Sequence, residues 1–302
     1  MSGISTNRTN ITLPAEVSQE IMQKMQGESA IMRLARKVAL PGRGLSIPVI
    51  TGDPTAAWVA ETGAKPVSNP TLSTKLMQAY KLAVIVPFSD EFRRDAAALY
   101  DAIVERLPGA LALKFDQTVI GAVEKPGENF DNFASATGQS IVAAEGHTAY
   151  NGLVAAYADI AAHNGILNGF GLSPAAEGIL LGATDSTGRP LFIPSVAEGK
   201  LPQILGAAVT TGRGLYKAGA AGVGTAAGTP AVVGVAGDWT QAVYGTVEGV
   251  QIRFADQTGL TIASQQVNLW EHNMFAVRAE IEVGFRADVD CFNKLLGAVP
   301  NA

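Results

Sequence analysis

The side chains that most often perform catalysis or hold metals are few and widely separated in this chain. Its three histidines, His147, His163 and His272, lack the spacings that bring ligands together on one metal, and the single cysteine, Cys291, adds no partner. The chain also lacks the glycine–lysine loop that binds nucleoside triphosphates and the G-x-S-x-G turn of serine hydrolases. These residues therefore predict neither a metal site nor a cofactor site.

Two carboxylate pairs and one glycine-rich run are the remaining candidates for chemistry. Asp90 with Glu91 and Asp288 with Asp290 are better explained as acids at a helix start and in a loop than as a catalytic dyad. The run 222-GVGTAAG-228 resembles a dinucleotide-binding loop only loosely, because its last glycine comes one residue late and a predicted strand follows instead of a helix. A mobile surface loop explains it better. We therefore predict that the protein is not an enzyme.

The composition indicates an oligomer instead. Of the 302 residues, 47% are hydrophobic and only 16% are charged, with 22 basic and 27 acidic side chains and a net charge of −5. A chain so poor in charge must cover more of its surface than a monomer can. The acidic balance, without any basic cluster, argues against tight nucleic-acid binding through phosphates.

The same composition excludes several classes of protein. One cysteine cannot form an intramolecular disulfide, so the sequence does not indicate a secreted fold that disulfides hold together. The apolar runs stay well short of the roughly 18 residues that a membrane span needs. The polar N-terminal stretch, residues 1–14, does not resemble a signal peptide, and we expect it to become ordered only on a neighbouring molecule.

Residues 1–50 are predicted to form an arm with two short helices. Pro14 can open the first helix, whose apolar positions recur every four residues up to Met25. Ser29 is expected to cap the second helix, with 36-RK-37 in its last turn.

Residues 55–86 predict a long β-hairpin. Apolar side chains from Leu72 to Val86 share one strand parity, and the expected partner is the short run around Trp58 and Val59. Half of this hairpin's surface is apolar, so it must lie either on its own body or on a neighbour.

The remainder predicts helices mixed with mainly antiparallel strands, an α+β fold. Ser89 and Asp90 are expected to start a long helix that is kinked at Pro108 and has apolar residues every four positions, at Leu99, Ile103, Leu107, Leu111, Phe115 and Val119. A second helix is expected at 148–163, with Thr148 as its cap, Leu153, Tyr157 and Ile160 facing inward and a stop at Asn164-Gly165. After a strand near 166–172, Ser173-Pro174 should open a third helix. Further strands are expected at 204–210, at 231–237 paired with 247–254, at 274–285, and in a short segment around Phe292 and Leu295.

Four segments in a fixed order carry a resemblance to a known family. They are 57-AWVAETGAKPVSNPTL-72 with 81-KLAVIVPFSDEFRRD-95, 99-LYDAIVERLPGALALKFDQTVIG-121, 173-SPAAEGILLGATDSTGRPLF-192 with 204-ILGAAV-209, and 233-VGVAGDW-239 through 269-LWEHNMFAVRAEIEVGF-285. Over about residues 15–297, the chain resembles the major capsid proteins of tailed bacteriophages with the Hong Kong 97-type fold. No single segment is diagnostic, but their common order is specific.

The resemblance implies a division into parts. Residues 1–50 would be the N-terminal arm and residues 51–86 the extended loop. Residues 87–148 and 262–302 would form the peripheral domain with its long spine helix. Residues 149–261 would form the axial domain, around the centre of each hexamer or pentamer.

The resemblance also implies the function, the partners and the location. Copies would self-assemble into hexamers and pentamers of an icosahedral shell around phage double-stranded DNA, which they would touch only weakly and non-specifically. A scaffolding segment often precedes the arm in this family, and the short stretch before it here implies a separate scaffolding protein, together with a portal and decoration proteins. The location would be the virion, after assembly in the host cytoplasm, with no membrane contact. An encapsulin-like bacterial compartment is one alternative, and an unrecognised soluble enzyme is another.

One chemical expectation comes from the family alone. Some members join subunits by an isopeptide bond between a loop lysine and an asparagine of another subunit, assisted by a glutamate. The residues that match here are Lys65, Asn273 and Glu280. Arg278 shares strand parity with Glu280 and would lower its basicity by pairing with it. Asn273 and Glu280 are seven residues apart, so in a regular strand they face opposite ways unless a bend or bulge intervenes.

Overall fold

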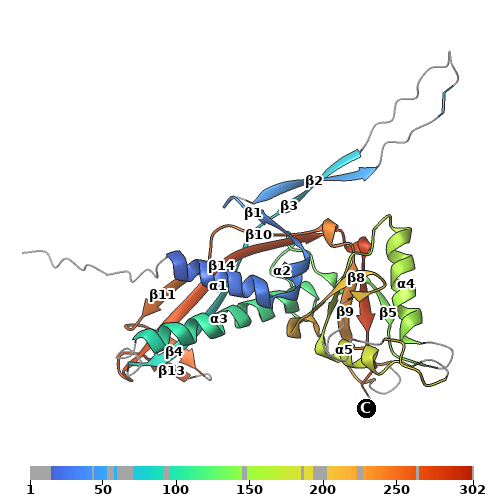
Figure 1. The fold of residues 1–302 in the computed structure, drawn as a ribbon. Coiled ribbons are helices and arrows are strands. Elements are labelled where there is room, and N and C mark those ends of the chain that lie inside the picture. The colour runs from blue at the N-terminus through green and yellow to red at the C-terminus, as the bar shows by residue number, and fades with distance from the viewer. Residues whose placement is uncertain are drawn as a thin grey trace, which may run out of the picture.

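The chain folds into one elongated α+β body, as predicted (Figure 1). The computed structural model describes residues 15–42, 44–52, 58–59, 71–90, 96–144, 148–184, 187–192, 203–222, 227–262 and 265–300. Its described strands form one five-stranded sheet, one six-stranded sheet and two two-stranded sheets. The predictions for residues 1–14 and for the hairpin tip fall outside these ranges.

The five-stranded sheet is built around the long strand β14 (Met274–Ala287). Three strands pair with it antiparallel: β4 (Tyr80–Ser89), β10 (Ala242–Thr246) and β11 (Gln251–Ala255). The fifth strand, β1 (Arg36–Ala39), lies parallel to β10. The 36-RK-37 pair therefore belongs to a strand, and its predicted place in a helix is wrong, because the second arm helix, α2 (Ala30–Leu34), ends earlier.

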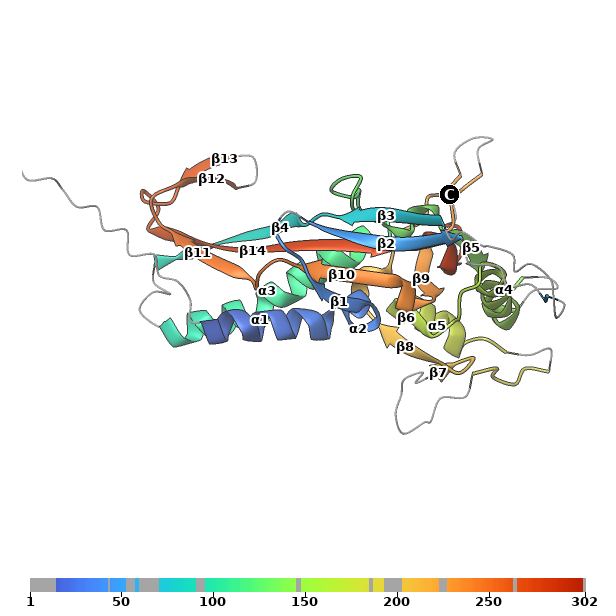
Figure 2. The same ribbon diagram turned by 90° about the horizontal axis from the view of Figure 1, so that it is seen from above.

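Two helices pack beside this sheet, as Figure 2 shows: α1 (Ala15–Glu28) and the spine helix α3 (Ala96–Val119). The spine helix continues through Pro108, and its four-residue apolar stripe is buried at every described position, Leu107, Leu111, Phe115 and Val119. The part of this helix that the structure describes begins at Ala96. Ser89 still pairs with Met274 in β4, and Asp90, whose N–H donates to the Asn273 carbonyl, has 3-10 helical geometry. Residues 91–95 lie outside the described residues, so the predicted start at Ser89 and Asp90 stays a prediction.

The six-stranded sheet has the order β5–β15–β9–β6–β8–β7. Its strands are β5 (Thr137–Ser140), β6 (Gly169–Leu172), β7 (Gln203–Ile204), β8 (Ala207–Thr211), β9 (Val232–Gly237) and β15 (Phe292–Leu296). Helices α4 (Ala149–Ala162) and α5 (Pro174–Leu181) share a separate hydrophobic core with it. Both predicted caps are confirmed, because the Thr148 and Ser173 hydroxyls accept hydrogen bonds from the first-turn N–H groups of Asn151 and Ala176.

Three further expectations differ from the structure, and one element was not expected. The strand expected at 204–210 is a tight hairpin, because Leu205 and Gly206 adopt positive φ angles of 49° and 79° and turn the chain. The stretches 231–237 and 247–254 do not pair, because β9 and β11 belong to different sheets. Tyr157 was expected to face inward but is 51% exposed. The separate hairpin of β12 (Gly259–Ile262) and β13 (Gln265–Asn268) was not predicted.

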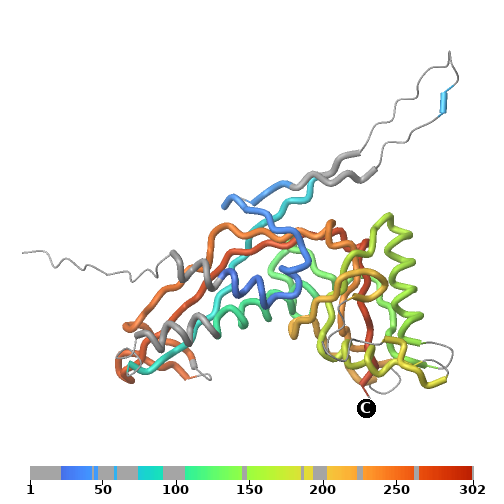
Figure 3. Tube along the Cα trace, viewed as in Figure 1, coloured from blue at the N-terminus to red at the C-terminus, as the bar shows by residue number. Residues whose placement is uncertain are grey.

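An aromatic cluster joins the two large sheets. Phe133 lies 4.6 Å, centroid to centroid, from Phe292 of the six-stranded sheet and 5.7 Å from Phe285 of the five-stranded sheet. The chain itself also crosses between the sheets where β14 leads into β15 (Figure 3). The sheets therefore do not coincide with the expected peripheral and axial domains. β15 and β14 fall in the expected peripheral domain, but they pair with β9 and β10 of the expected axial domain. The division into peripheral and axial domains stays a prediction.

Candidate functional site

A β-hairpin that leaves the body is the most prominent feature of the structure (Figure 1). It consists of β2 (Leu45–Gly52) and β3 (Thr71–Met77), paired antiparallel from Leu45 opposite Met77 to Ile50 opposite Leu72. The predicted partner of β3, the run around Trp58 and Val59, is therefore wrong. Those two residues are not in a strand, and the run 45-LSIPVI-50, with its β-branched residues, takes that place.

The apolar run from Leu72 to Val86 is divided between two sheets. Gln78 and Ala79 separate β3 from β4, and β4 then pairs with β14. Within β4 the predicted parity is confirmed, because its inward apolar side chains pack against the main core, namely those of Tyr80, Leu82, Val84 and Val86. This part of the run is covered by its own subunit and does not require a neighbour.

The root of the hairpin, the part around Met77 and Gln78, packs against two glycines of the five-stranded sheet. Gly245 of β10 lies opposite Gly284 of β14, and the space that their side chains would occupy is filled by Leu40 and by Met77. A Cβ on Gly284 would lie 2.7 Å from the Gln78 carbonyl oxygen, and one on Gly245 would lie 2.5 Å from Leu40 Cγ. Glycine at position 284 lets the backbone of the root approach the sheet this closely, and glycine at position 245 leaves room for the side chains of Leu40 and Met77.

Arg286 fixes the same root through its guanidinium. Its Nε donates to the Leu76 carbonyl over 2.8 Å, and its Nη1 forms an ion pair with Asp131 Oδ1 at 2.7 Å. Nη2 also donates to Asn129 Oδ1 over 3.0 Å. Because the planar guanidinium directs its donors along fixed directions, this network holds β3, the 128–131 loop and β14 in one geometry.

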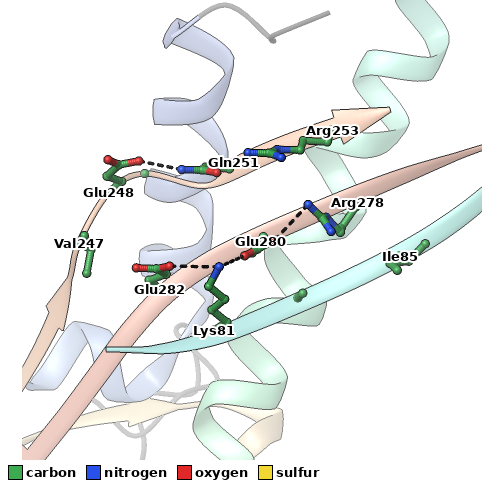
Figure 4. Close-up of a pocket in the computed structure, with 11 residues that line it drawn as sticks. Lys81, Ile85, Val247, Glu248, Gln251, Arg253, Arg278, Glu280 and Glu282 are labelled. Carbon is green, nitrogen blue, oxygen red and sulfur yellow. Dashed lines mark hydrogen bonds and ion pairs between the residues drawn. The ribbon is translucent and has the colours of Figure 1, made fainter. Parts of the chain in front are cut away.

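A charged groove of ≈ 650 Å³ runs along the outer face of β4, β14 and β11 (Figure 4). The strand register aligns Glu282 with Lys81, and Arg278 with both Arg253 and Ile85. Lys81 Nζ lies 3.0 Å from Glu280 Oε1 and 3.5 Å from Glu282 Oε1. These side chains form a ladder of ion-paired acids and bases on an otherwise open sheet face.

Glu280 is the central acid of this ladder. The hydrogen bond from Lys81 is the main cause that holds the pKa of Glu280 below its usual value, and Arg278, 3.5 Å away, adds to it. The same contact raises the pKa of Lys81. The expected pairing of Glu280 with Arg278 is confirmed, and a carboxylate held in two ion pairs is a weak proton acceptor.

Of the three residues expected to cross-link, Asn273 and Glu280 do not meet within one subunit. Lys65 lies outside the described residues. Asn273 is exposed in the turn before β14, with a φ of 50°, and its carbonyl accepts from the Asp90 N–H. Glu280 lies seven residues along an unbroken strand pairing, which corresponds to roughly 23 Å. A site that contained both Asn273 and Glu280 would need them from different copies.

A buried carboxylate that the sequence reasoning missed ties the arm to the spine helix. Asp116 Oδ1 accepts from the Ser29 hydroxyl at 2.5 Å, and its Oδ2 accepts from the Ala30 N–H at 3.0 Å. Burial raises the pKa of Asp116 to about 6, although these hydrogen bonds oppose the shift. The signal in the sequence was an acid directly beside Phe115 in the apolar stripe of the helix.

The described part of the chain offers neither a metal centre nor a membrane span. No group of three or more histidine, cysteine, aspartate or glutamate side chains is placed there to hold a metal ion. None of the helices described is both long and apolar enough to span a bilayer.

The chain is similar to phage capsid proteins in both sequence and fold. The phage capsid family matches residues 9–288. A protein of Mycobacterium phage L5 described as "Probable major capsid protein gp17" is 31% identical over 94% of this chain and 88% of its own length. The protein of the same description from Mycobacterium phage D29 is 27% identical over 95% and 90%.

Solved structures show the same fold at lower identity. A chain from Gordonia phage Cozz superposes with a TM-score of 0.69 at 22% identity, over 90% of this chain and 87% of that one. A chain from a native GTA particle capsid covers 99% of this chain and 96% of its own length, with a TM-score of 0.60 at 15% identity.

Proposed function

The chain belongs to the phage capsid family, and from that premise we propose how its copies build a shell. It is a major capsid protein, a structural component of the virion. We propose that it adopts the Hong Kong 97-type fold and assembles into hexamers and pentamers of an icosahedral shell around double-stranded DNA. The β2–β3 hairpin would lie on an adjacent copy and hold the two together.

The fixed root of the hairpin is the observation that carries this proposal. A protruding two-stranded hairpin is marginally stable on its own and gains stability only from a surface that covers it. The close packing on Gly245 and Gly284 and the hydrogen bonds of Arg286 restrain the root of the hairpin. The hairpin would therefore lose little orientational freedom when it docks on another copy. A pre-oriented element that leaves its own body is suited to contact another copy.

Among the other expected partners, the composition bears on double-stranded DNA. A net charge of −5 and the absence of a basic cluster suit an inner wall along which DNA slides during packaging. We propose that a separate scaffolding protein, a portal and decoration proteins act with this chain during assembly in the host cytoplasm. An encapsulin-like compartment is the alternative, and nuclease digestion of the particle contents separates the two.

Deletion of the hairpin tip tests the clamp. A variant that lacks residues 61–71 should fold but should not form closed shells, because the tip would no longer reach its neighbour. Cryo-EM and size-exclusion chromatography of the full-length chain and of the deletion variant measure this. A variant of unchanged length with the tip sequence scrambled is the control for loop length. Closed shells of normal stability from the deletion variant would refute the clamp.

We also propose the covalent link between Lys65 and Asn273 of different copies. The neutral amine would attack the side-chain amide carbon, an isopeptide C–N bond would form, and the amide nitrogen would leave as ammonia. Glu280 could accept the amine proton only after its ion pairs with Lys81 and Arg278 open.

Denaturing gel electrophoresis of mature particles tests this link. Cross-linking predicts ladders that Lys65→Ala abolishes and that Lys125→Ala, a matched change at an exposed lysine, leaves intact. A single band near 31.3 kDa from wild-type particles would mean that non-covalent contacts alone hold the shell.

A further inference from the structure

The hairpin of β2 and β3 is joined to the body by short segments that lie outside the strands. In the described part of the chain, β2 and β3 pair only with each other, and Gln78 and Ala79 separate β3 from β4. At the other connection, Gly44 precedes β2 with a φ of 87°. We call Gln78 and Ala79 the hinge, because a few residues between two sheets are able to absorb a change of direction.

The packing at the root keeps the hairpin close to the sheet but does not by itself fix its direction. Met77 forms a small apolar cluster with Leu40 and Val243. Apolar contact is non-directional, so the hairpin could tilt while this cluster stays buried. The direction of the hairpin therefore depends on hydrogen bonds, whose geometry is directional.

The loop of residues 127–131 lies beside the hinge and is attached to the body (Figure 2). The Asp131 N–H donates to the Phe285 carbonyl over 3.1 Å, and Asp131 Oδ2 accepts from the Ala287 N–H over 3.2 Å. Phe130 is buried, and its ring lies 6.1 Å, centroid to centroid, from that of Phe285. Because β14 holds this loop, the loop provides a fixed point next to the hinge.

Asn129 of this loop contacts the chain at the hinge and on both sides of it. Its Nδ2 donates to Gln78 Oε1 over 3.3 Å, and its N–H donates to the Tyr80 hydroxyl at the start of β4 over 3.3 Å. Its Oδ1 accepts from Arg286 over 3.0 Å, and the same guanidinium donates to the Leu76 carbonyl in β3. One side chain therefore links the hairpin, the hinge and the body.

We propose that Asn129 is a positioning residue that holds the hinge in one conformation and thereby sets the direction of the hairpin and the curvature of the shell. If the hairpin holds an adjacent copy, the angle between the two copies follows the direction in which the hairpin leaves its body. A shell closes only when its contacts repeat at the right angles. The effect on the shell rests on the proposed function, whereas the restraint on the hinge is a property of the single subunit.

The distance between two spin labels measures the direction of the hairpin in the unassembled subunit. Thr74→Cys places one label on β3, and Glu248→Cys places the other between β10 and β11, both at exposed positions. The native Cys291 should take up little label, because it is buried and burial raises the pKa of its thiol to about 11. Asn129→Ala should broaden the distribution of distances. Asn151→Ala, a matched change at an exposed asparagine of α4, should leave the distribution as narrow as in the wild type.

Two further variants distinguish a restrained hinge from a general loss of stability. Asn129→Asp keeps an acceptor for Arg286 but loses the donor to Gln78, so its distribution should be broadened less than that of Asn129→Ala. Adding Tyr80→Phe to Asn129→Ala also removes the acceptor of the Asn129 N–H, and should broaden the distribution further. Distances are measured well below each melting temperature, where a merely stabilising role would leave the distribution narrow. Distributions of wild-type width in both Asn129→Ala and the double variant would overturn the proposal.

Cryo-EM of assembled particles tests the effect on the shell. Asn129→Ala should give particles of mixed diameter or open fragments, whereas Asn151→Ala should give particles of the wild-type diameter. Uniform particles of the wild-type diameter from Asn129→Ala would overturn the link between the direction of the hairpin and the curvature of the shell. If the wild-type chain forms no particles, the proposed function fails, and the spin-label distances still decide whether Asn129 holds the hinge.

Discussion

At the scale of single residues, Asp116 connects the N-terminal arm to the spine helix. Its carboxylate accepts hydrogen bonds from Ser29 and from the backbone N–H groups of Ala30 and Ile31. The Ser29 hydroxyl in turn caps α2 by accepting from the Met32 N–H. One buried side chain therefore determines where the arm rests on the body.

The raised pKa of Asp116 makes the stability of the subunit depend on pH. Burial penalises the ionised form and raises the pKa from 3.8 to about 6, so the folded protein binds this proton more tightly than the unfolded chain does. The free energy of unfolding should therefore rise as the pH falls from about 6 to about 4, by about 3 kcal/mol for this group.

Replacing Asp116 with asparagine should remove this contribution. Urea unfolding of unassembled Asp116→Asn at pH 7 and pH 4.5 should show less gain at the lower pH than the wild type shows. Glu248→Gln, a change at an exposed carboxylate, is the matched control and should keep the wild-type difference. Equal pH dependence in Asp116→Asn and the wild type would mean that Asp116 does not titrate in this range.

At the scale of elements, the hairpin root depends on a close approach between a strand and a sheet. Met77 is fully buried at this root, and Gly284 and Gly245 leave the space for it. Two side chains at these positions would lift the hairpin from the sheet and change its direction. The sequence shows these glycines only as breaks in a strand pattern.

Gly284→Ala should therefore destabilise the subunit. The new Cβ would lie 2.7 Å from the Gln78 carbonyl oxygen, a backbone atom that cannot rotate away, and overpacking of this kind costs about 1–3 kcal/mol. Gly259→Ala is the matched control, because a Cβ there meets nothing closer than 3.7 Å. Denaturant unfolding should show the loss for Gly284→Ala and almost none for Gly259→Ala. Equal stability of the two variants would contradict the close packing of the root.

At the scale of the whole molecule, the low charge fits the proposed role, in which copies of the chain cover one another and enclose DNA without binding it tightly. The two sheets share an aromatic cluster, in which Trp239 lies 5.2 Å from Phe292, so they form one body. The charged groove pairs acids with bases along β14, which leaves no surplus of positive charge on that face.

The subunit should consequently not retain double-stranded DNA at about 0.15 M salt. A gel-shift titration of the unassembled chain with a duplex of random sequence measures this, and a variant with added surface lysines is the positive control. Tight binding by the wild type with a steep salt dependence would contradict an inner wall that lets DNA slide.

The sequence by itself determined the features that depend on near neighbours in the chain. The α+β class, the caps at Thr148 and Ser173 and the inward parity of β4 were predicted and are confirmed. Caps and strand alternation are set by residues within one turn or one strand, so local spacing reveals them. The capsid-like segments likewise predicted the family, because their order along the chain is a property of the sequence alone.

Only the tertiary structure decided which distant segments meet. It gave β3 the partner β2, left Tyr157 exposed and buried Asp116 beside Ser29. It also placed Asn273 in the turn before β14 and Glu280 seven residues further along, within that continuous strand. Each of these outcomes depends on the packing of residues far apart in the chain, where several pairings satisfy the same local pattern and the burial of the whole molecule selects one of them.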